Sequence, residues 1–287
     1  MTGQPAIHAG TSAVEILSDG VVAYDVGDVF PDVEPARLAT LLAGRLDSDG
    51  MLPLPYHPLL VRTADGPVLL DAGAGEDLAA EWNAPIGGTE GSLGAAGVTT
   101  GEIVLVLITH AHADHIGGLT VERDGVRVPR YPKARHVMSG LEWDYWLGSG
   151  PVRPADDYLA SIARLHLLPL RQAGLLELTD GEVDVAPGVR IIPAPGHTPG
   201  HVAVQVEIGA VELLALGDAV LHAEHVAHPD WPSRMDVDAA QTVATRRRLL
   251  DRASGHHALV HGFHLTELGH AERAGEGYRF TGIESSG

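Results

Sequence analysis

Short apolar runs, separated by turns rich in glycine and proline, recur along most of this chain. Runs rich in Val, Ile and Leu predict strands at 21–24, 59–63, 68–70, 103–109, 136–138, 183–185, 189–192, 202–208, 211–216 and 258–260. The apolar positions of 154–168 and 237–253 recur at helical spacing instead and predict two helices. Asp236 or Asp238 is the candidate N-cap of the second helix.

The order of these elements predicts an α/β protein. Short turns at 64–67 and 209–210 join neighbouring strands into hairpins, and an order of strands, helix and further strands recurs in two halves. This order predicts two sheets sandwiched between helices. Residues 86–101 are rich in Gly and Thr and predict an irregular connection. No linker divides the chain, so we expect one domain over residues 1–287.

Composition narrows the classes of partner. The chain carries 38 acidic and 19 basic side chains, a formal net charge of −19. This charge repels phosphate backbones and anionic membranes, so we expect a small-molecule substrate, no nucleic acid and no membrane partner. The absence of cysteine excludes a disulfide framework. No apolar run reaches membrane-spanning length and residues 1–8 lack signal-peptide features, so we expect a cytoplasmic protein.

The strongest chemical signal is a cluster of metal-binding side chains directly after the 103–109 strand. His110, His112, Asp114 and His115 lie within six residues. Imidazole and carboxylate ligands suit zinc and its borderline neighbours, and no thiolate is available. A metal held there can turn water into a nucleophile at neutral pH.

Further candidate ligands follow three other predicted strands. His197 comes after 189–192, Asp218 after 211–216, and both His261 and His264 after 258–260. If these strands belong to packed sheets, the side chains converge on one edge, where α/β proteins usually place their sites. His201 is expected to be a structural hydrogen-bonding residue instead.

Together, these motifs resemble those of the metallo-β-lactamase superfamily. The resemblance rests on His110-x-His112-x-Asp114-His115, on the Gly-His-Thr-Pro-Gly-His segment at 196–201, on Gly217-Asp218 and on a late histidine, and it runs from about residue 68 to 264. The segment from Asp218 to Trp231 and Gly262-Phe263-His264 are more similar to the branch of dinuclear lactonases and methyl-parathion-hydrolase-like phosphotriesterases. The resemblance implies a four-layer αββα sandwich.

The same resemblance implies a ligand set for two divalent ions. His110, His112 and His197 would hold one ion, Asp114, His115 and His264 the other, and Asp218 would bridge them. His261 remains the alternative to His264. We expect Zn²⁺, with Mn, Fe and Co also compatible with these ligands.

Three carboxylates form the expected catalytic set, Asp114, Asp218 and Asp71. Asp71 resembles a family position that orients a ligand imidazole, and the alternative is that it only caps a turn.

The implied function is a dinuclear metal-dependent hydrolase. A shared hydroxide would attack a lactone or related ester, and phosphotriesters are a further candidate substrate class. The alternatives are thioester hydrolysis as in glyoxalase II, β-lactam hydrolysis, or a metal-binding module without catalysis. The acidic balance disfavours an anionic glutathione conjugate.

The substrate pocket is predicted less directly than the ligands. Trp143 and Trp146 are candidates for its apolar wall, with core packing or a homodimer contact as alternatives, and Ser139-x-x-Glu142 before them matches a helix capping box. Some lactonases place a substrate-polarising tyrosine three residues after the bridging aspartate. That position is Leu221 here, and His222 is the candidate substitute.

Overall fold

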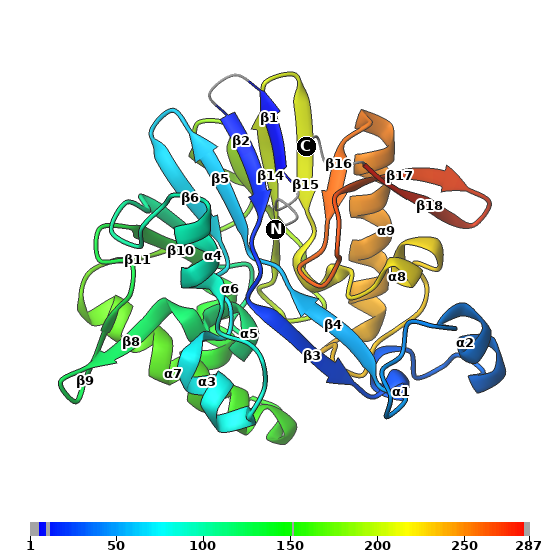
Figure 1. Ribbon diagram of the computed structural model, residues 1–287, viewed down its shortest axis with the longest axis horizontal. Helices are drawn as coiled ribbons and strands as arrows, with labels where there is room; N and C mark the ends of the chain where they lie inside the picture. The colour runs from blue at the N-terminus through cyan, green and yellow to red at the C-terminus, as the bar shows by residue number, and fades with distance from the viewer. Residues whose placement is uncertain (1–5, 10–11, 151, 284–287) are drawn as a thin grey trace.

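Two large sheets packed face to face form the centre of the protein, and helices cover their outer faces (Figure 1). The structure, a computed structural model, describes residues 6–9, 12–150 and 152–283. Within these residues each large sheet has seven strands. This arrangement confirms the predicted αββα sandwich.

The first sheet is antiparallel on one side and parallel on the other. Its strands, in spatial order, are β1 (Ala6–Ala9), β2 (Ser12–Ile16), β5 (Leu59–Thr63), β6 (Gly66–Leu70), β7 (Leu105–Leu107), β10 (Arg135–Ser139) and β11 (Leu176–Thr179). Pairing is antiparallel from β1 to β6 and parallel from β6 to β11. The predicted hairpin at 59–70 is therefore present as β5 and β6.

The second sheet is antiparallel except at one pair. Its strands are β12 (Val183–Ala186), β13 (Val189–Pro193), β14 (Val202–Ile208), β15 (Val211–Ala215), β16 (Leu259–His261), β17 (Gly269–Ala274) and β18 (Gly277–Gly282). Strands β15 and β16 pair in parallel. Two smaller ribbons complete the strands, β3 (Gly20–Tyr24) with β4 (Leu52–Tyr56) and β8 (Thr120–Arg123) with β9 (Val126–Pro129).

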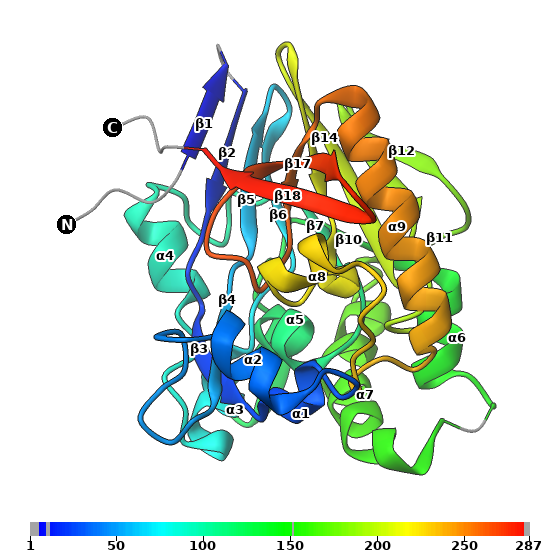
Figure 2. The ribbon, with the colours of Figure 1, turned by 90° about the vertical axis from the view of Figure 1, so that its right-hand side faces the viewer.

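Helices lie outside both sheets (Figure 2). On the side of the first sheet these are α3 (Gly75–Trp82), α4 (Thr89–Ala95), α5 (Ala113–Ile116), α6 (Gly140–Leu147) and α7 (Asp157–Gln172). On the side of the second sheet they are α8 (Ala223–Ala227) and α9 (Ala239–His256). Helices α1 (Val26–Val29) and α2 (Pro35–Leu41) pack on β4 through apolar side chains. Short 3-10 turns lie at η1 (Gly117–Leu119), η2 (Pro154–Asp156) and η3 (Gly217–Ala219).

Aliphatic side chains from the two sheets interdigitate to form the central core. Members of this cluster include Val14, Val61 and Val68 from the first sheet and Val189, Val204 and Leu213 from the second, all buried. Separate clusters lie between the first sheet and its helices and between the second sheet and α9. Because both faces of each sheet are covered, central strands are apolar throughout, which is why they appear as continuous hydrophobic runs.

Several boundaries differ from the prediction. Residues 86–101 contain α4, because Leu93 is fully buried and anchors a helix whose Gly91 and Gly94 obscure the periodicity. The strand predicted at 103–109 is shorter, and Asp238, not Asp236, caps α9. In the described chain, no helix combines the length and apolar character that crossing a membrane requires. Residues 1–5, part of the segment used to judge a signal peptide, lie outside the described residues.

A buried arginine connects α9 to the loop after β15. Arg246 has no exposed surface, and its guanidinium donates to the carbonyl oxygens of Ala219 (2.5 Å), Trp231 (2.6 Å) and Pro229 (3.2 Å). Burial lowers the pKa of Arg246 to about 10, so the side chain is still a cation at neutral pH. Since Ala219 follows Asp218, this arginine holds the segment that carries a candidate ligand.

We expect Arg246→Met to lower the free energy of unfolding by about 2–4 kcal/mol. Methionine fills similar space but leaves three buried carbonyl oxygens without their donor. Urea unfolding followed by circular dichroism measures the change. Arg247→Met is the matched control, because its side chain is 41% exposed. An equal loss of unfolding free energy in the two variants would show that the buried contacts of Arg246 add nothing to stability beyond what an exposed arginine contributes.

Candidate metal centre

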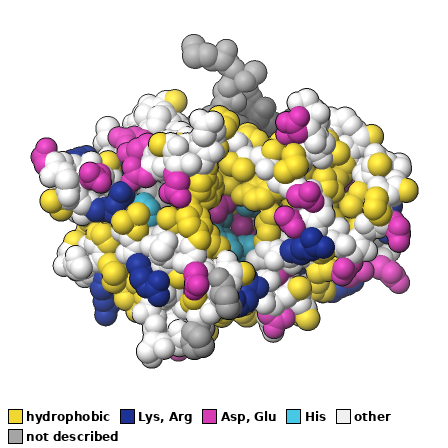
Figure 3. All heavy atoms as spheres, turned by 90° about the horizontal axis from the view of Figure 1, so that it is seen from below, with side chains coloured by type: hydrophobic (Ala, Val, Ile, Leu, Met, Phe, Trp, Pro, Cys, Tyr) yellow, Lys and Arg dark blue, Asp and Glu magenta, His cyan; other side chains and the backbone are white. Residues whose placement is uncertain are grey.

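The predicted ligands meet at one edge of the sandwich, beyond the ends of β7, β13, β15 and β16. Figure 3 shows this face, where acidic and histidine side chains lie at the floor of a hollow surrounded by hydrophobic side chains. The residues form two groups, and in each group the candidate ligand atoms lie within 4.8 Å of one another.

The first group contains His110, His112, His197 and Asp218. The Nε2 atom of His197 lies 3.0 Å from Nδ1 of His112 and 3.3 Å from Oδ2 of Asp218. The Nε2 atom of His110 is 3.8 Å from the same carboxylate oxygen. All four residues are buried or nearly so, which places three imidazoles and one carboxylate around a common point.

The second group contains Asp114, His115 and His264. Oδ2 of Asp114 lies 3.7 Å from Nε2 of His115 and 3.6 Å from Nε2 of His264. Asp218 also faces this group, with Oδ1 3.3 Å from His115 Nε2 and Oδ2 3.3 Å from His264 Nε2. The Asp218 carboxylate therefore contacts ligand atoms of both groups.

The chemistry of these atoms fits two divalent cations. Among the described residues, His110 Nε2, His115 Nε2 and Asp218 Oδ1 are buried and have no hydrogen-bond partner. Burial lowers the pKa of His110 and His112 well below the usual value, so these imidazoles stay neutral with a free lone pair. Buried polar atoms without a partner are costly, and a cation would satisfy all three.

Groups behind the ligands fix the orientation of several histidine rings. Asp71 accepts hydrogen bonds from Thr109 N, Thr109 Oγ1 and His115 Nδ1, each at 2.8 Å, and adopts a φ of 59°. The Nδ1 atom of His197 lies 3.0 Å from Asp236, and that of His264 lies 2.9 Å from the carbonyl of Pro55. A proton on each Nδ1 leaves Nε2 free to face the group of ligands. Sequence reasoning considered Asp236 only as a helix cap and missed this contact.

The two late histidines lie in different surroundings. His264 belongs to the second group, whereas His261 lies in neither. The His261 ring is buried, with its centroid 6.5 Å from that of His57, and its Nε2 has no hydrogen-bond partner in the described structure. His201 bonds through Nδ1 to the carbonyl of Ala194 and accepts from the backbone N–H of Asp218, so it positions the Asp218 backbone.

A cavity of about 360 Å³ opens over the ligands. Besides His112, Asp114, His197, Asp218 and His264, its lining includes Tyr24, Trp82, Leu159, Met235 and Arg153. Sequence reasoning missed these residues because they come from distant parts of the chain, namely β3, α3, the segment before η2, α7 and the loop before α9.

None of the four residues predicted to wall the pocket is among those that line this cavity. Trp146 is fully buried in the core, and Trp143 stacks under the Arg171 guanidinium at 5.6 Å. Leu221 is buried against α1 and α2, and His222 caps α8. Sequence position does not fix which way the side chains of α6 and of the 219–222 loop point.

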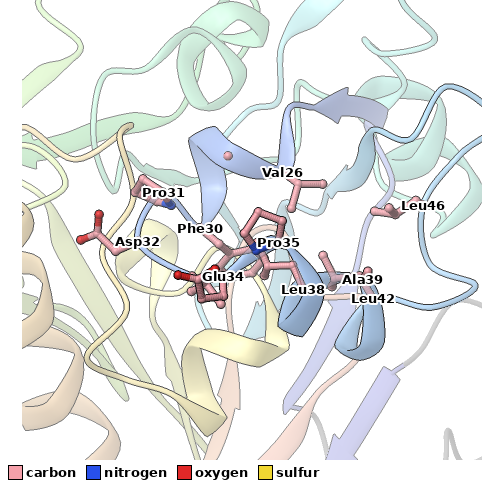
Figure 4. Close-up of a pocket in the computed structure, with 12 residues that line it drawn as sticks. Val26, Phe30, Pro31, Asp32, Glu34, Pro35, Leu38, Ala39, Leu42 and Leu46 are labelled. Atoms are coloured by element: carbon pink, nitrogen blue, oxygen red, sulfur yellow. The ribbon is translucent and has the colours of Figure 1, made fainter.

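A second cavity, of about 500 Å³, lies on the N-terminal helices α1 and α2 (Figure 4). Its lining is mostly apolar and includes Val26, Phe30, Pro35, Leu38 and Leu42. None of the residues that line it belongs to the two ligand groups. This cavity is therefore separate from the candidate metal centre.

Comparison with known proteins identifies the family. A family model described as the metallo-beta-lactamase superfamily matches residues 52–259. The chain belongs to the metallo-beta-lactamase superfamily. Its relatives include the probable metallo-hydrolase Mb2322c of Mycobacterium bovis, 26% identical over 231 residues that cover 66% of this chain and 64% of that protein. An N-acyl homoserine lactonase of a Bacillus species is 26% identical over 193 residues, covering 59% and 63%.

The names of these relatives agree with the predicted enzyme class and branch. The chain spans less than two thirds of the length of each of these two relatives. The solved structure of AidC, a dizinc quorum-quenching lactonase, is 24% identical with a TM-score of 0.84 and 98% of both chains covered. That of the hydrolase AbOPH is 21% identical with a TM-score of 0.87, covering 99% of this chain and 98% of the other. At these identities the likeness establishes the fold.

We expect His264→Ala to weaken binding of one zinc ion by more than about 100-fold, beyond the effect of losing an orienting partner. His261→Ala should leave zinc binding unchanged, because His261 lies outside both groups. Competition with a chromophoric chelator measures both variants. Zinc loss in His261→Ala with full retention in His264→Ala would reverse this assignment.

Proposed function

We propose that this protein is a dinuclear metal-dependent hydrolase of lactones or related esters, with zinc as its metal. The observation that carries the proposal is the position of Asp218, whose carboxylate lies 3.3 Å from nitrogen atoms of His197, His115 and His264. A carboxylate shared by two ligand groups is suited to bridge two cations and to offset their mutual repulsion.

The residues that would hold each ion follow from the two groups. His110, His112 and His197 would hold the first, Asp114, His115 and His264 the second, with Asp218 between them. Divalent ions held there would supply Lewis acidity and would lower the pKa of a bound water toward about 7. Asp71 and Asp236 keep the proton of His115 and His197 on Nδ1, which preserves the basicity of the facing nitrogen.

The cavity favours a neutral substrate with an apolar substituent. Trp82, Leu159 and Met235 supply apolar lining. Both cations of the lining already face a carboxylate, Arg153 that of Asp156 at 2.8 Å and Arg234 that of Asp28 at 3.4 Å. A lactone, a simple ester and a phosphotriester are all neutral and carry a polarisable double-bonded oxygen. Phosphotriesters therefore remain a second candidate substrate class, whereas a thioester or β-lactam carrying an anionic group fits this lining less well.

A tyrosine from the N-terminal part of the chain is the candidate donor to that oxygen. Tyr24 lines the cavity, and its hydroxyl is hydrogen-bonded to the hydroxyl of the fully buried Tyr56. Burial, together with the nearby charge of Asp114, raises the pKa of Tyr24, so the phenol keeps its proton. If Tyr56 donates to Tyr24, the Tyr24 proton is free to bond the substrate oxygen.

We expect Tyr24→Phe to lower kcat about 100-fold with little change in KM, because the donor acts mainly on charge that develops in the transition state. Steady-state kinetics on the best substrate measure the split. Tyr131→Phe is the control, since Tyr131 is fully buried and is not among the residues that line the cavity. Equal kinetics in Tyr24→Phe and the unchanged protein would remove Tyr24 from this role.

A substrate panel tests the proposed function. It contains N-acyl homoserine lactones, simple lactones, aryl esters, a paraoxon-type triester, a thioester and a β-lactam. We expect kcat/KM to be highest for lactones or esters, to be lost on removal of metal by a chelator, and to return when zinc is added. A thioester or β-lactam as best substrate would shift the proposal to that chemistry, and two bound ions without turnover on any substrate would favour a metal-binding module.

The remaining expectations concern the setting of this activity. Exposed apolar side chains on α6 and α7, namely Leu141, Tyr158, Leu165 and Leu168, are compatible with the expected homodimer. The homodimer and the cytoplasmic location stay predictions.

A further inference from the structure

A single buried carboxylate joins three segments of the protein next to the candidate metal centre. Glu142, in α6, is fully buried and accepts four hydrogen bonds. Oε1 accepts from the backbone N–H of Ala111 (2.9 Å) and from Trp146 Nε1 (2.6 Å). Oε2 accepts from Thr198 Oγ1 (2.7 Å) and from the backbone N–H of Gly200 (3.0 Å).

The donors to Glu142 flank the three histidines of the first group. Ala111 lies between His110 and His112, and Thr198 follows His197. The Trp146 ring, which Glu142 orients, lies edge-on to the His112 ring with centroids 5.6 Å apart. None of the donors flanks His115 or His264 in this way, so the carboxylate acts on one ligand group and not on the other.

The contact between these segments is close. A Cβ atom at Gly200 would lie 2.0 Å from the backbone nitrogen of Glu142, so the loop at 196–201 meets the first turn of α6 directly. Each oxygen of Glu142 faces two hydrogen-bonding groups, and three of these four groups are N–H groups that can only donate. A glutamine of the same shape would place its amide nitrogen against at least one of these N–H groups, that of Gly200 in the orientation where the nitrogen takes the place of Oε2.

Glu142 has no part in capping its own helix. The sequence pattern Ser139-x-x-Glu142 predicts a reciprocal capping box, and Ser139 does cap α6 by accepting from the backbone N–H of Leu141. The four hydrogen bonds of Glu142 run instead to the two ligand loops and to Trp146. Its conformation is therefore not explained by helix formation alone.

We propose that Glu142 is a positioning residue that sets the spacing between the His110–His112 loop and His197, and so controls the affinity of the first metal site separately from the second. The inference rests on the proposed two-metal function. It concerns the geometry of three imidazoles in the folded protein, so metal binding tests it without any substrate.

The experiment measures zinc affinity in two backgrounds, each with one site weakened. In His264→Ala the first site remains, and adding Glu142→Gln should lower its affinity about 10- to 100-fold, the usual effect of losing an orienting partner. In His197→Ala the second site remains, and adding Glu142→Gln should leave its affinity unchanged. Chelator competition gives both affinities, and the comparison forms a double-mutant cycle.

Two further variants separate positioning from general loosening. Ser139→Ala removes the cap of α6 and should lower the melting temperature while leaving both zinc affinities unchanged. Thr198→Val removes one of the four donors and should give the same selective effect at smaller size, which keeps the test valid if Glu142→Gln does not fold.

The possible results point in different directions. Equal weakening of both sites by Glu142→Gln, or no weakening of the first, would overturn the positioning role while leaving two-metal binding intact. Failure of the unchanged protein to bind two ions would instead overturn the proposed function, and this inference with it.

Discussion

The shared position of the Asp218 carboxylate is the constraint on which the rest of the site depends. Its oxygens lie 3.3 Å from nitrogen atoms of both ligand groups, so a small shift of this residue would separate the groups. The surrounding structure holds it from several sides. His201 accepts from its backbone N–H, and Arg246 binds the carbonyl of the next residue. Gly217 adopts a φ of +52°, and a Cβ there would lie 2.6 Å from His201 Nε2, so only glycine fits.

Neither half of the sandwich makes a site alone. The first half supplies His110 and His112 to one group and Asp114 and His115 to the other, whereas the second supplies His197, Asp218 and His264. The distances within each group therefore depend on how the two sheets pack across the aliphatic core between them. The core fixes the relative position of strand ends, and hydrogen bonds such as those of Glu142 adjust the loops that follow. Core packing thus sets the distance between the strand ends, and polar contacts set the finer positions of the ligands in the loops that follow them.

The sequence predicts the ligands better than the pocket for a physical reason. Metal ligands are recognisable because their residue types and spacing are chemically restricted, and His110, His112, Asp114 and His115 combine both signals. A pocket wall has no such restriction, since any apolar side chain serves, and Tyr24 and Met235 come from segments far from the ligand motifs. Trp146 and Leu221 have suitable chemistry but point into the core. Glu142 matches a local capping pattern, and only tertiary structure reveals that its carboxylate serves two distant loops.

Three buried carboxylates, those of Asp71, Asp236 and Glu142, hold the histidines of the two ligand groups in position. Asp71 orients His115 of the second group and reaches His110 of the first through Thr109 Oγ1, whereas Asp236 and Glu142 act on the first group through His197 and its neighbouring backbone. Burying carboxylates is unfavourable unless their oxygens are paired, and each of these three accepts hydrogen bonds that only the correct loop conformation provides. Folding of the loops and orientation of the imidazoles are therefore one process, which couples metal affinity to local stability. Because Asp236 and Glu142 contact the first group alone, substitutions at these two residues would alter that group without the other, whereas Asp71, through Thr109, and Asp218 contact both groups.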